Sequence, residues 1–198
     1  GDSKYLPGVC LLEDLLGVRR QYLGKDVYYA GRLLYTYDAE RERQGLLVVP
    51  RHSKARVVAV VLSSRRRRPI RVLLKVEDGR VGFVDVQASG TNSDIQGYKV
   101  WDYLEFSNPR DGYQGSEEVW RLIQSGEIAI GMTKEEVLLS LGGPQLSLEI
   151  QPGVAVDEIW SFTSSRDDDL LFGGRTLHFW QGEVRIRNDK VIGFTRSR

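Results

Sequence analysis

The sequence is poor in the residues that most often bind metals or form disulfides. It has one cysteine, Cys10, and two histidines, His52 and His178, among 198 residues. A single cysteine excludes an internal disulfide, and so few Cys and His side chains argue against a zinc site or a cysteine–histidine nucleophilic pair. His52 follows Pro50 in an expected turn, where we expect it to be exposed to solvent. We predict no metal and no cofactor.

The sequence also lacks an excess of charge of one sign and a long apolar run. Its 28 Lys and Arg nearly balance 27 Asp and Glu, which gives a net charge of +1. No overall field therefore favours nucleic acid or an anionic membrane, and we expect no nucleic-acid partner. No apolar run approaches the ~18 residues of a membrane helix. The chain starts at Gly1 without a methionine, and we expect an export signal to precede it in the natural protein.

No phosphate-binding glycine pattern, nucleophile elbow or other catalytic set occurs, so we predict that the chain is not an enzyme. What is present is 41% hydrophobic residues, enough for one core or two small ones. The segment "SNPRDGYQGS", Ser107–Ser116, is rich in turn-forming residues and indicates a connector. We predict an N-terminal domain over 1–107, a linker over 108–115 and a C-terminal domain over 116–198.

The N-terminal domain is expected to be a small barrel preceded by a helix. Leucines at helical spacing, among them Leu12, Leu15 and Leu16, predict one amphipathic helix over Val9–Leu23. Short runs rich in β-branched and aromatic residues follow, and such runs are typical of strands. The predicted strands are Val27–Tyr37, Leu46–Val49, Ala55–Leu62, Ile70–Val76, Val81–Gln87 and Tyr98–Phe106. Strands this short and this close together favour a closed or rolled sheet.

One hairpin in this domain has a local signal. Asp78 and Gly79 separate two predicted strands and can supply the positive-φ pair of a two-residue turn. Together with "GLLVVPRHSKARVVAVV", Gly45–Val61, this hairpin resembles a bacterial SH3-like barrel over roughly Gly24–Phe106. The resemblance implies an SH3-like fold for the N-terminal domain.

The C-terminal domain is predicted to begin with two short helices that have clear ends. Ser116 is a good N-cap for the first, and Gly126 ends it. For the second, Thr133 and Glu136 have the spacing of a capping box, and Met132 can pack against Val137 as a hydrophobic staple. These features fix where the second helix begins.

The same helix has an equally clear end. Gly142 or Gly143 can adopt a left-handed conformation, and Pro144 prevents continuation. We expect Val137, Leu138 and Leu141 to be buried, because so short a helix needs tertiary packing. Alternating apolar and polar residues then predict three antiparallel strands, over 157–162, 176–187 and 190–197, the last two joined by a tight turn.

The order of two helices and three strands, led by "GMTKEEVLLSLGGP", resembles the SmpA/OmlA family, also called BamE-like, over about Ser116–Arg198. The family pattern falls on Gly131, Met132, Thr133, Glu136, Val137, Gly142, Gly143, Pro144 and Trp160. The resemblance implies a two-helix, three-stranded α+β domain in which these residues are structural. It also implies a bacterial envelope lipoprotein in the periplasm or anchored to the outer membrane.

Two groups of residues are candidates for binding. Arg65, Arg66, Arg67 and Arg68 concentrate positive charge between two predicted strands and could contact lipid phosphates, although a solvated turn is the plainer interpretation. Tyr28, Tyr35 and Tyr37 lie on one predicted strand and could line a peptide groove, although aromatic residues more often pack in a core.

The resulting hypothesis is a non-enzymatic cell-envelope protein that binds a protein or an anionic lipid, with a role in outer-membrane protein assembly or envelope integrity. One alternative is an inhibitor of a secreted or envelope hydrolase, because the helix–helix–sheet order also resembles β-lactamase inhibitory proteins. Another is a binder of anionic surfaces through the four arginines at 65–68. The sequence leaves the partner and the oligomeric state open.

Overall fold

The computed structural model describes residues 12–38, 43–63, 70–86, 103–144, 146–150, 156–162 and 181–196, without the side chains of 37, 38, 43 and 44. The chain divides into two compact units, Gly1–Tyr113 and Gln114–Arg198. The division falls inside the segment predicted as a linker. Each unit is described by itself below as unit 1 and unit 2.

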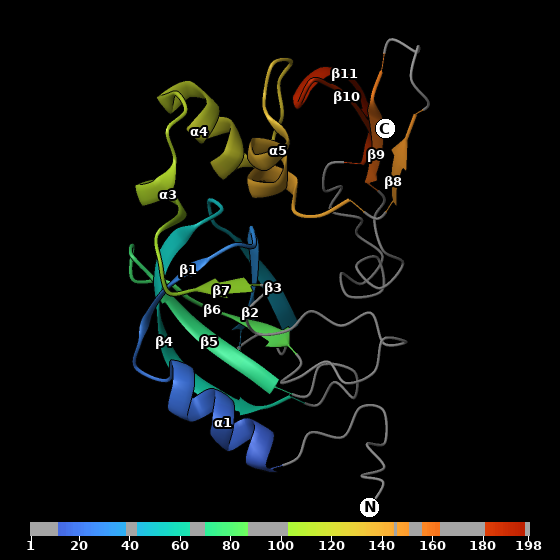
Figure 1. The fold of residues 1–198 in the computed structure, drawn as a ribbon. Helices are drawn as coiled ribbons and strands as arrows, with labels where there is room; N and C mark the ends of the chain where they lie inside the picture. The colour runs from blue at the N-terminus through green and yellow to red at the C-terminus, as the bar shows by residue number, and fades with distance from the viewer. Residues whose placement is uncertain are drawn as a thin grey trace, which may run out of the picture. The chain divides into compact units, whose positions relative to one another are not determined.

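In its described residues, unit 1 contains helix α1, an antiparallel sheet and a final short helix, α3 (Figure 1). Its elements are α1 (Leu12–Tyr22), β1 (Asp26–Tyr29), β2 (Leu33–Asp38), β3 (Arg43–Val48), β4 (Ser53–Leu62), β5 (Ile70–Val76), β6 (Val81–Val86), β7 (Leu104–Glu105) and α3 (Pro109–Gly112). Most predicted strands are present. The single strand predicted over Val27–Tyr37 is instead two strands, β1 and β2, because the chain leaves the sheet at Ala30–Arg32.

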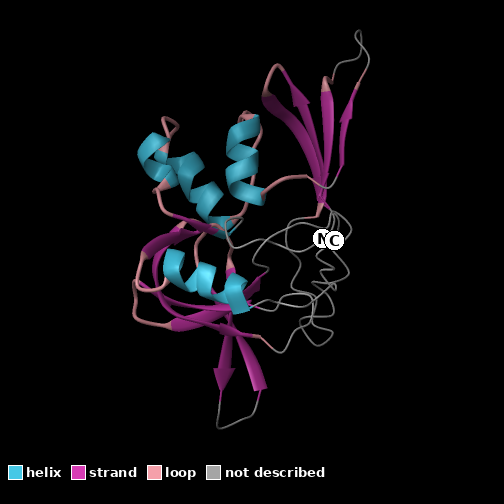
Figure 2. Ribbon diagram, turned by 60° about the horizontal axis from the view of Figure 1, so that its bottom comes forward, coloured by secondary structure: helices cyan, strands magenta, loops and turns pink. Residues whose placement is uncertain are grey.

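The strand order shows that this sheet is rolled. The order is β3-β2-β6-β5-β4-β1-β7, so β1 and β2 lie on opposite sides of the β4–β5–β6 meander. In a flat sheet, four inter-strand steps would separate β1 from β2 by about 19 Å. The link from Tyr29 to Leu33 spans at most about 14 Å when fully extended. The two sides of the sheet therefore curl toward each other (Figure 2).

The turn between β5 and β6 differs from the prediction. Val76 N–H donates to Arg80 O, and Gly79 N–H donates to Val76 O, both at 2.9 Å. Gly79 has a φ of +87°, whereas Asp78 is not among the residues with positive φ. The loop is thus a turn over Glu77 and Asp78 followed by a left-handed glycine, and not a two-residue turn. This three-residue loop is the next most common hairpin solution.

The core of unit 1 fills the rolled sheet. β5 alternates between buried and more exposed residues, as expected for a strand with one face inward. Helix α1 lies against β4 (Figure 1) and buries Leu15, Val18 and Tyr22. Leu12 and Leu16 are exposed, so the inward face is one position away from the face that the leucines suggested. Fully buried side chains come from every central strand: Val27, Leu34, Val57, Ile70, Val72, Leu74 and Val86.

Unit 2 combines two helices with a four-stranded antiparallel sheet of order β11-β10-β9-β8. Its elements are α4 (Glu117–Ser125), α5 (Lys134–Leu141), β8 (Leu146–Glu149), β9 (Glu158–Phe162), β10 (Gly182–Arg187) and β11 (Lys190–Arg196). The predicted three-stranded sheet is wrong by one strand, β8. Its four residues are all exposed and follow Pro144 closely, so the sequence pattern gives almost no signal for it.

The remaining predictions for unit 2 concern helix ends and the last turn. Ser116 Oγ accepts a hydrogen bond from Val119 N–H at 3.2 Å, and Gly126 is left-handed with φ of 67°. Asn188 and Asp189 both have positive φ, at 48° and 63°. Two positive-φ residues between paired strands are the mark of a type I′ turn. The predicted caps of the first helix and the tight last turn are confirmed.

Candidate functional site

The basic loop predicted as a binding element, Arg65 to Arg68, lies outside the described residues, as do Cys10 and His178. The strands on either side are described, and Leu62 of β4 pairs with Ile70 of β5. The loop therefore joins the two strands of one hairpin. Its contact with an anionic partner stays a prediction.

The three tyrosines proposed for a groove do not share one strand. Tyr28 is half-buried on β1, whereas Tyr35 is on β2. Tyr35 is buried and stacks on Phe83, with ring centroids 5.5 Å apart. Tyr37 is on β2, but its side chain is not described. Because Tyr35 packs inside unit 1, the predicted row of three exposed rings is not present.

The segment that resembles the BamE-like family forms a capped helix attached to β11. Thr133 Oγ1 accepts a hydrogen bond from Glu136 N–H at 3.2 Å, and the Glu136 carboxylate accepts one from Thr133 N–H at 2.8 Å. Gly131, with φ of +93°, donates its N–H to Val191 O, and Val191 N–H donates to Met132 O. The predicted capping box is confirmed, and main-chain bonds hold its first residues on the sheet.

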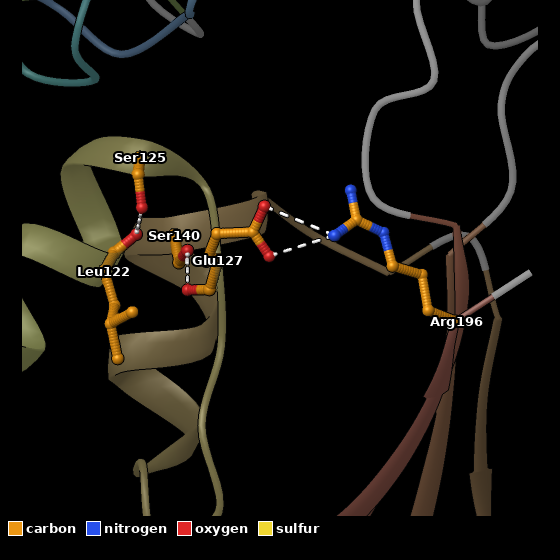
Figure 3. A network of polar contacts seen from close by, with 5 residues as sticks. All are labelled: Leu122, Ser125, Glu127, Ser140 and Arg196. Carbon is orange, nitrogen blue, oxygen red and sulfur yellow. Dashed lines mark hydrogen bonds and ion pairs between the residues drawn. The ribbon is translucent and has the colours of Figure 1, made fainter. Parts of the chain in front are cut away.

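Helix α5 buries a different face from the predicted one. Val137 is fully buried, as expected, but Leu138 is 42% exposed. Ser140 is buried instead, and its hydroxyl donates to Glu127 O at 2.7 Å (Figure 3). The Glu127 carboxylate accepts a bond from Arg196 at 3.2 Å. A polar contact thus holds α5 where the sequence suggested a leucine.

The end of α5 follows the prediction in part. Gly142 has φ of 84° and ψ of −168°, and its N–H donates to Leu138 O. This conformation is essentially restricted to glycine, although it is not the left-handed helical one. Gly143 is exposed and Pro144 is partly buried just beyond it. A glycine is therefore required at the first position after the helix.

Trp160 belongs to a small polar network in unit 2. The ring is buried, and its Nε1–H donates to the Glu158 carboxylate at 2.8 Å. The other oxygen of Glu158 accepts a hydrogen bond from Lys134 Nζ. This bond holds the pKa of Glu158 below its usual range and raises the pKa of Lys134. The network joins α5 to β9 and supports a structural role for Trp160.

A polar cluster in unit 1 was not found from the sequence. We call it the arginine–tyrosine cluster, and it consists of Tyr29, Arg32, Arg51, His52, Tyr103 and Glu105. Three main-chain bonds bring its segments together. His52 N–H donates to Tyr29 O at 2.7 Å, Ala30 N–H donates to Tyr103 O at 2.8 Å, and Val49 N–H donates to Arg32 O at 2.8 Å. The cluster thus lies where the break between β1 and β2 meets the β3–β4 turn and β7.

The ring of Tyr29 is fixed on several sides. Its hydroxyl donates to Leu33 O at 2.5 Å, and its ring stacks on Tyr103 with centroids 6.0 Å apart. A Cβ at Gly31 would lie only 2.4 Å from the Tyr29 hydroxyl oxygen. Glycine is therefore the residue that fits at the break between the two strands, and Tyr29 is held in a single position.

The cluster buries charge. Burial lowers the pKa of Arg51 to about 10; the nearby Tyr29 opposes this shift, and the positive charge of Arg32 adds to it. Burial also raises the pKa of Tyr29 and, against the effect of Arg51, the pKa of Glu105. Strongly shifted titratable groups that gather in one place are typical of functional sites, although structural networks also produce them.

His52 corrects an expectation. It was predicted to be exposed, but it is 6% exposed, and its Nδ1 lies 4.0 Å from the Glu105 carboxylate. It also has a φ of 56°, which is uncommon for a residue with a side chain. The left-handed turn directs the ring toward β7 because the His52 N–H must reach Tyr29 O. Nothing in "VVPRHSK" distinguishes this turn from an exposed one.

Across the described ranges, no three or more His, Cys, Asp or Glu side chains are grouped so that they could hold a metal ion. No helix in the part of the chain that the structure covers has both the length and the apolar character to cross a membrane.

No protein-family model, curated protein or solved structure matches this chain. The resemblances to the BamE-like family and to SH3-like barrels therefore rest on the motifs and on the element order alone.

Proposed function

We propose that the chain is a non-enzymatic binding protein of a bacterial cell envelope, and that unit 2 binds an extended segment of a partner protein along β8. The observation that carries this proposal is the difference between the two edges of the unit 2 sheet. An edge strand with unpaired main-chain groups is a template for strand addition by another chain.

The start of the β11 edge is covered within unit 2. Gly131 N–H and Met132 O bond with Val191, and Lys134 N–H donates to Asp189 O at 3.2 Å. A partner strand could not pair with this part of β11 without displacing these bonds. The segment that leads into helix α5 therefore occupies the first residues of this edge.

The β8 edge is open over the residues that the structure describes. Ile150 N–H donates to Asp157 O, which places residue 150 in a hydrogen-bonded pair with the β9 side. Because main-chain groups alternate along a strand, Ser147 and Glu149 direct theirs away from β9. These two residues offer the donors and acceptors that an added strand needs.

Apolar side chains accompany this edge. Leu146 is 51% exposed and Leu148 is 49% exposed. Leu148 is paired with Ile159 of β9, so the two side chains share the face of the sheet opposite to buried Trp160. A partner strand beside β8 would bury the leucines, and each buried apolar side chain contributes about 1.5–3 kcal/mol.

The proposed location in the cell envelope and the proposed SH3-like and BamE-like folds rest on the resemblances. The capping box at Thr133, the glycine stop at Gly142 and the helix–helix–sheet order support a BamE-like unit 2. The rolled antiparallel sheet supports an SH3-like unit 1. A fourth strand, β8, is additional to the three-stranded pattern, and it is the strand to which we assign binding.

Proline substitution tests the open edge. Ser147→Pro removes an outward N–H but no bond to β9, so unit 2 should remain folded while strand addition is lost. Ser147→Ala keeps the N–H and is the matched control. Circular dichroism and the unfolding midpoint check the fold of both variants.

Partner contact is measured in the bacterial host with a photo-crosslinking residue at Leu148, and with the same residue at Thr195 on β11 as a control. We expect an envelope-fraction adduct from position 148 that Ser147→Pro removes and Ser147→Ala keeps. An adduct of unchanged yield in Ser147→Pro, or equal adducts from both positions, would contradict binding along β8. An adduct with a second copy of the chain would show that β8 binds another copy of this chain and not a different partner protein.

A further inference from the structure

The arginine–tyrosine cluster contains two buried guanidinium nitrogens without a hydrogen-bond partner among the described residues. In the described part of unit 1, Arg32 Nε and Arg51 Nε are both buried and neither has a hydrogen-bond partner. An unpartnered buried donor costs about 1–3 kcal/mol, and more when the group is charged. Buried polar groups without a partner are uncommon in folded proteins, so two in one cluster need an explanation.

The carboxylate of the cluster does not neutralise this charge. Glu105 lies within electrostatic range of Arg51, but its nearest ion-pair contact is His52, at 4.0 Å. Burial raises the pKa of Glu105, and the charge of Arg51 opposes that shift. Arg32 and Arg51 also repel each other, since the charge of Arg32 destabilises the cationic form of Arg51. The cluster therefore has a local excess of positive charge in a chain that is nearly neutral.

Hydrogen bonds within unit 1 fix the main chain that carries the two arginines. Val49 N–H bonds to Arg32 O, and the adjacent residue of Arg51, His52, bonds to Tyr29 O. Ser53 Oγ donates to Pro50 O at 2.6 Å, which closes the turn that carries Arg51. Both arginines remain partly exposed, so a solute can reach them. Preorganised donors with access to solvent bind an anion at lower entropic cost than flexible ones.

We propose that Arg32 and Arg51 form a binding site for a phosphate group. A guanidinium presents a planar fork of N–H donors that fits two oxygens at once. One fork satisfies a carboxylate, whereas two forks fit the three or more oxygens and the larger charge of a phosphate. The stacked rings of Tyr29 and Tyr103 form the adjacent apolar wall. Both inorganic phosphate and the phosphate of a lipid headgroup have this chemistry.

The full chain is the material for the test, and inorganic phosphate is the first probe. The thermal unfolding midpoint is recorded against phosphate concentration, with chloride added to keep ionic strength constant. We expect the midpoint to rise with phosphate, because a ligand that binds only the folded state stabilises it. No rise in the unmodified chain, combined with no binding to lipid vesicles, overturns the proposal.

Variants assign the effect to the cluster. Arg51→Gln and Arg32→Gln should each weaken phosphate binding by about tenfold or more, because each removes a charge-assisted fork. Arg56→Gln is the matched control, since Arg56 has the same charge but its side chain is 63% exposed on β4. Equal phosphate binding in Arg51→Gln and Arg56→Gln overturns the proposal. If one of the two cluster variants fails to fold, phosphate binding by the other variant and by the unmodified chain still tests the proposal.

Vesicles distinguish the two phosphate sources. Co-sedimentation with phosphatidylglycerol vesicles, compared with phosphatidylcholine alone at the same ionic strength, measures headgroup binding. The run Arg65–Arg68 could attract such vesicles by itself, so a chain with these four residues replaced by serine is the background. In that background, loss of sedimentation on Arg51→Gln identifies a lipid phosphate as the ligand. Phosphate-dependent stabilisation without vesicle binding identifies a free phosphate, and an unchanged sedimentation in Arg51→Gln counts against the lipid source.

Discussion

Arg71 on β5 and Arg51 in the β3–β4 turn both belong to unit 1, but only Arg71 forms a hydrogen-bonded ion pair within the described residues. Arg71 on β5 donates two hydrogen bonds to the carboxylate of Asp85 on β6, at 2.7 and 2.9 Å, and the Asp85 side chain is fully buried. Arg71 also lies over the Phe83 ring, 3.8 Å from its centroid. Unit 1 can therefore satisfy a guanidinium completely from neighbouring strands. At Arg51 it does not, which is why we regard the unpaired state there as a functional feature.

Removal of the carboxylate from the paired site should have the largest effect. Asp85→Ala leaves Arg71 partly buried without its partner, and breaking such a pair costs about 3–5 kcal/mol. Chemical denaturation measures the free energy of unfolding. Asp85→Asn, which keeps the shape and one acceptor oxygen, should lose less. A loss below about 1 kcal/mol in Asp85→Ala would show that the paired site is no different from a surface pair.

The unpaired site should respond in the opposite direction. Arg51→Gln removes a charge whose burial the cluster compensates only in part, so we expect stability in phosphate-free buffer to rise by about 1 kcal/mol. The same variant should lose phosphate binding, so the substitution would increase stability and reduce function. The measurement is the free energy of unfolding in chloride buffer alone. A clear loss of stability would mean that Arg51 has a compensating contact in the folded chain and that the contrast with Arg71 does not hold.

The Lys134–Glu158 pair of unit 2 should be intermediate, because both side chains are partly exposed. Glu158→Gln removes the ion pair but keeps an acceptor for Trp160, and we expect a loss of about 1 kcal/mol at neutral pH. The pKa of Glu158 is lowered from its usual 4.5. Its contribution is therefore present above pH 4.5 and is lost as pH falls through the lowered pKa. Denaturation curves of both proteins should converge once the pH is below the lowered pKa of Glu158; a difference that persists in acid would contradict the ion-pair origin.

The smallest effect is expected at the β5–β6 turn. Arg80 donates to the Asp78 carboxylate at 2.7 Å, which raises the pKa of Arg80 and lowers that of Asp78, yet both side chains are about half exposed. Solvent screens such a pair, so Arg80→Gln should leave the unfolding midpoint unchanged within error. A measurable loss would show that hydrogen-bond geometry, more than burial, decides what these ion pairs contribute.

Local signals in the sequence predicted local structure well. The capping box at Thr133 and the cap at Ser116 depend on residues within one turn, and both are present as predicted. The turn at Asn188–Asp189 also follows from neighbouring residues. Such features are set by short-range hydrogen bonds, which the sequence displays directly.

Features that depend on distant residues were missed. His52 is buried beside Glu105 of β7, which lies far along the chain. Strand β8 exists because β9 pairs with it, not because its four exposed residues alternate. The arginine–tyrosine cluster combines three segments, so no single window of sequence contains its pattern. The SH3-like and BamE-like assignments and the role of the basic loop stay predictions.

The position of β7 affects how unit 1 is completed during synthesis. β1 emerges early, but its partner β7 is synthesised only at Leu104 and Glu105, well after β4, which pairs with its other side. Until then the nascent chain exposes one edge of β1 and lacks the third segment of the cluster. In a chain truncated before Leu104, the β4–β5–β6 meander could still form. The edge of β1 that normally pairs with β7 would stay open and would be prone to aggregation.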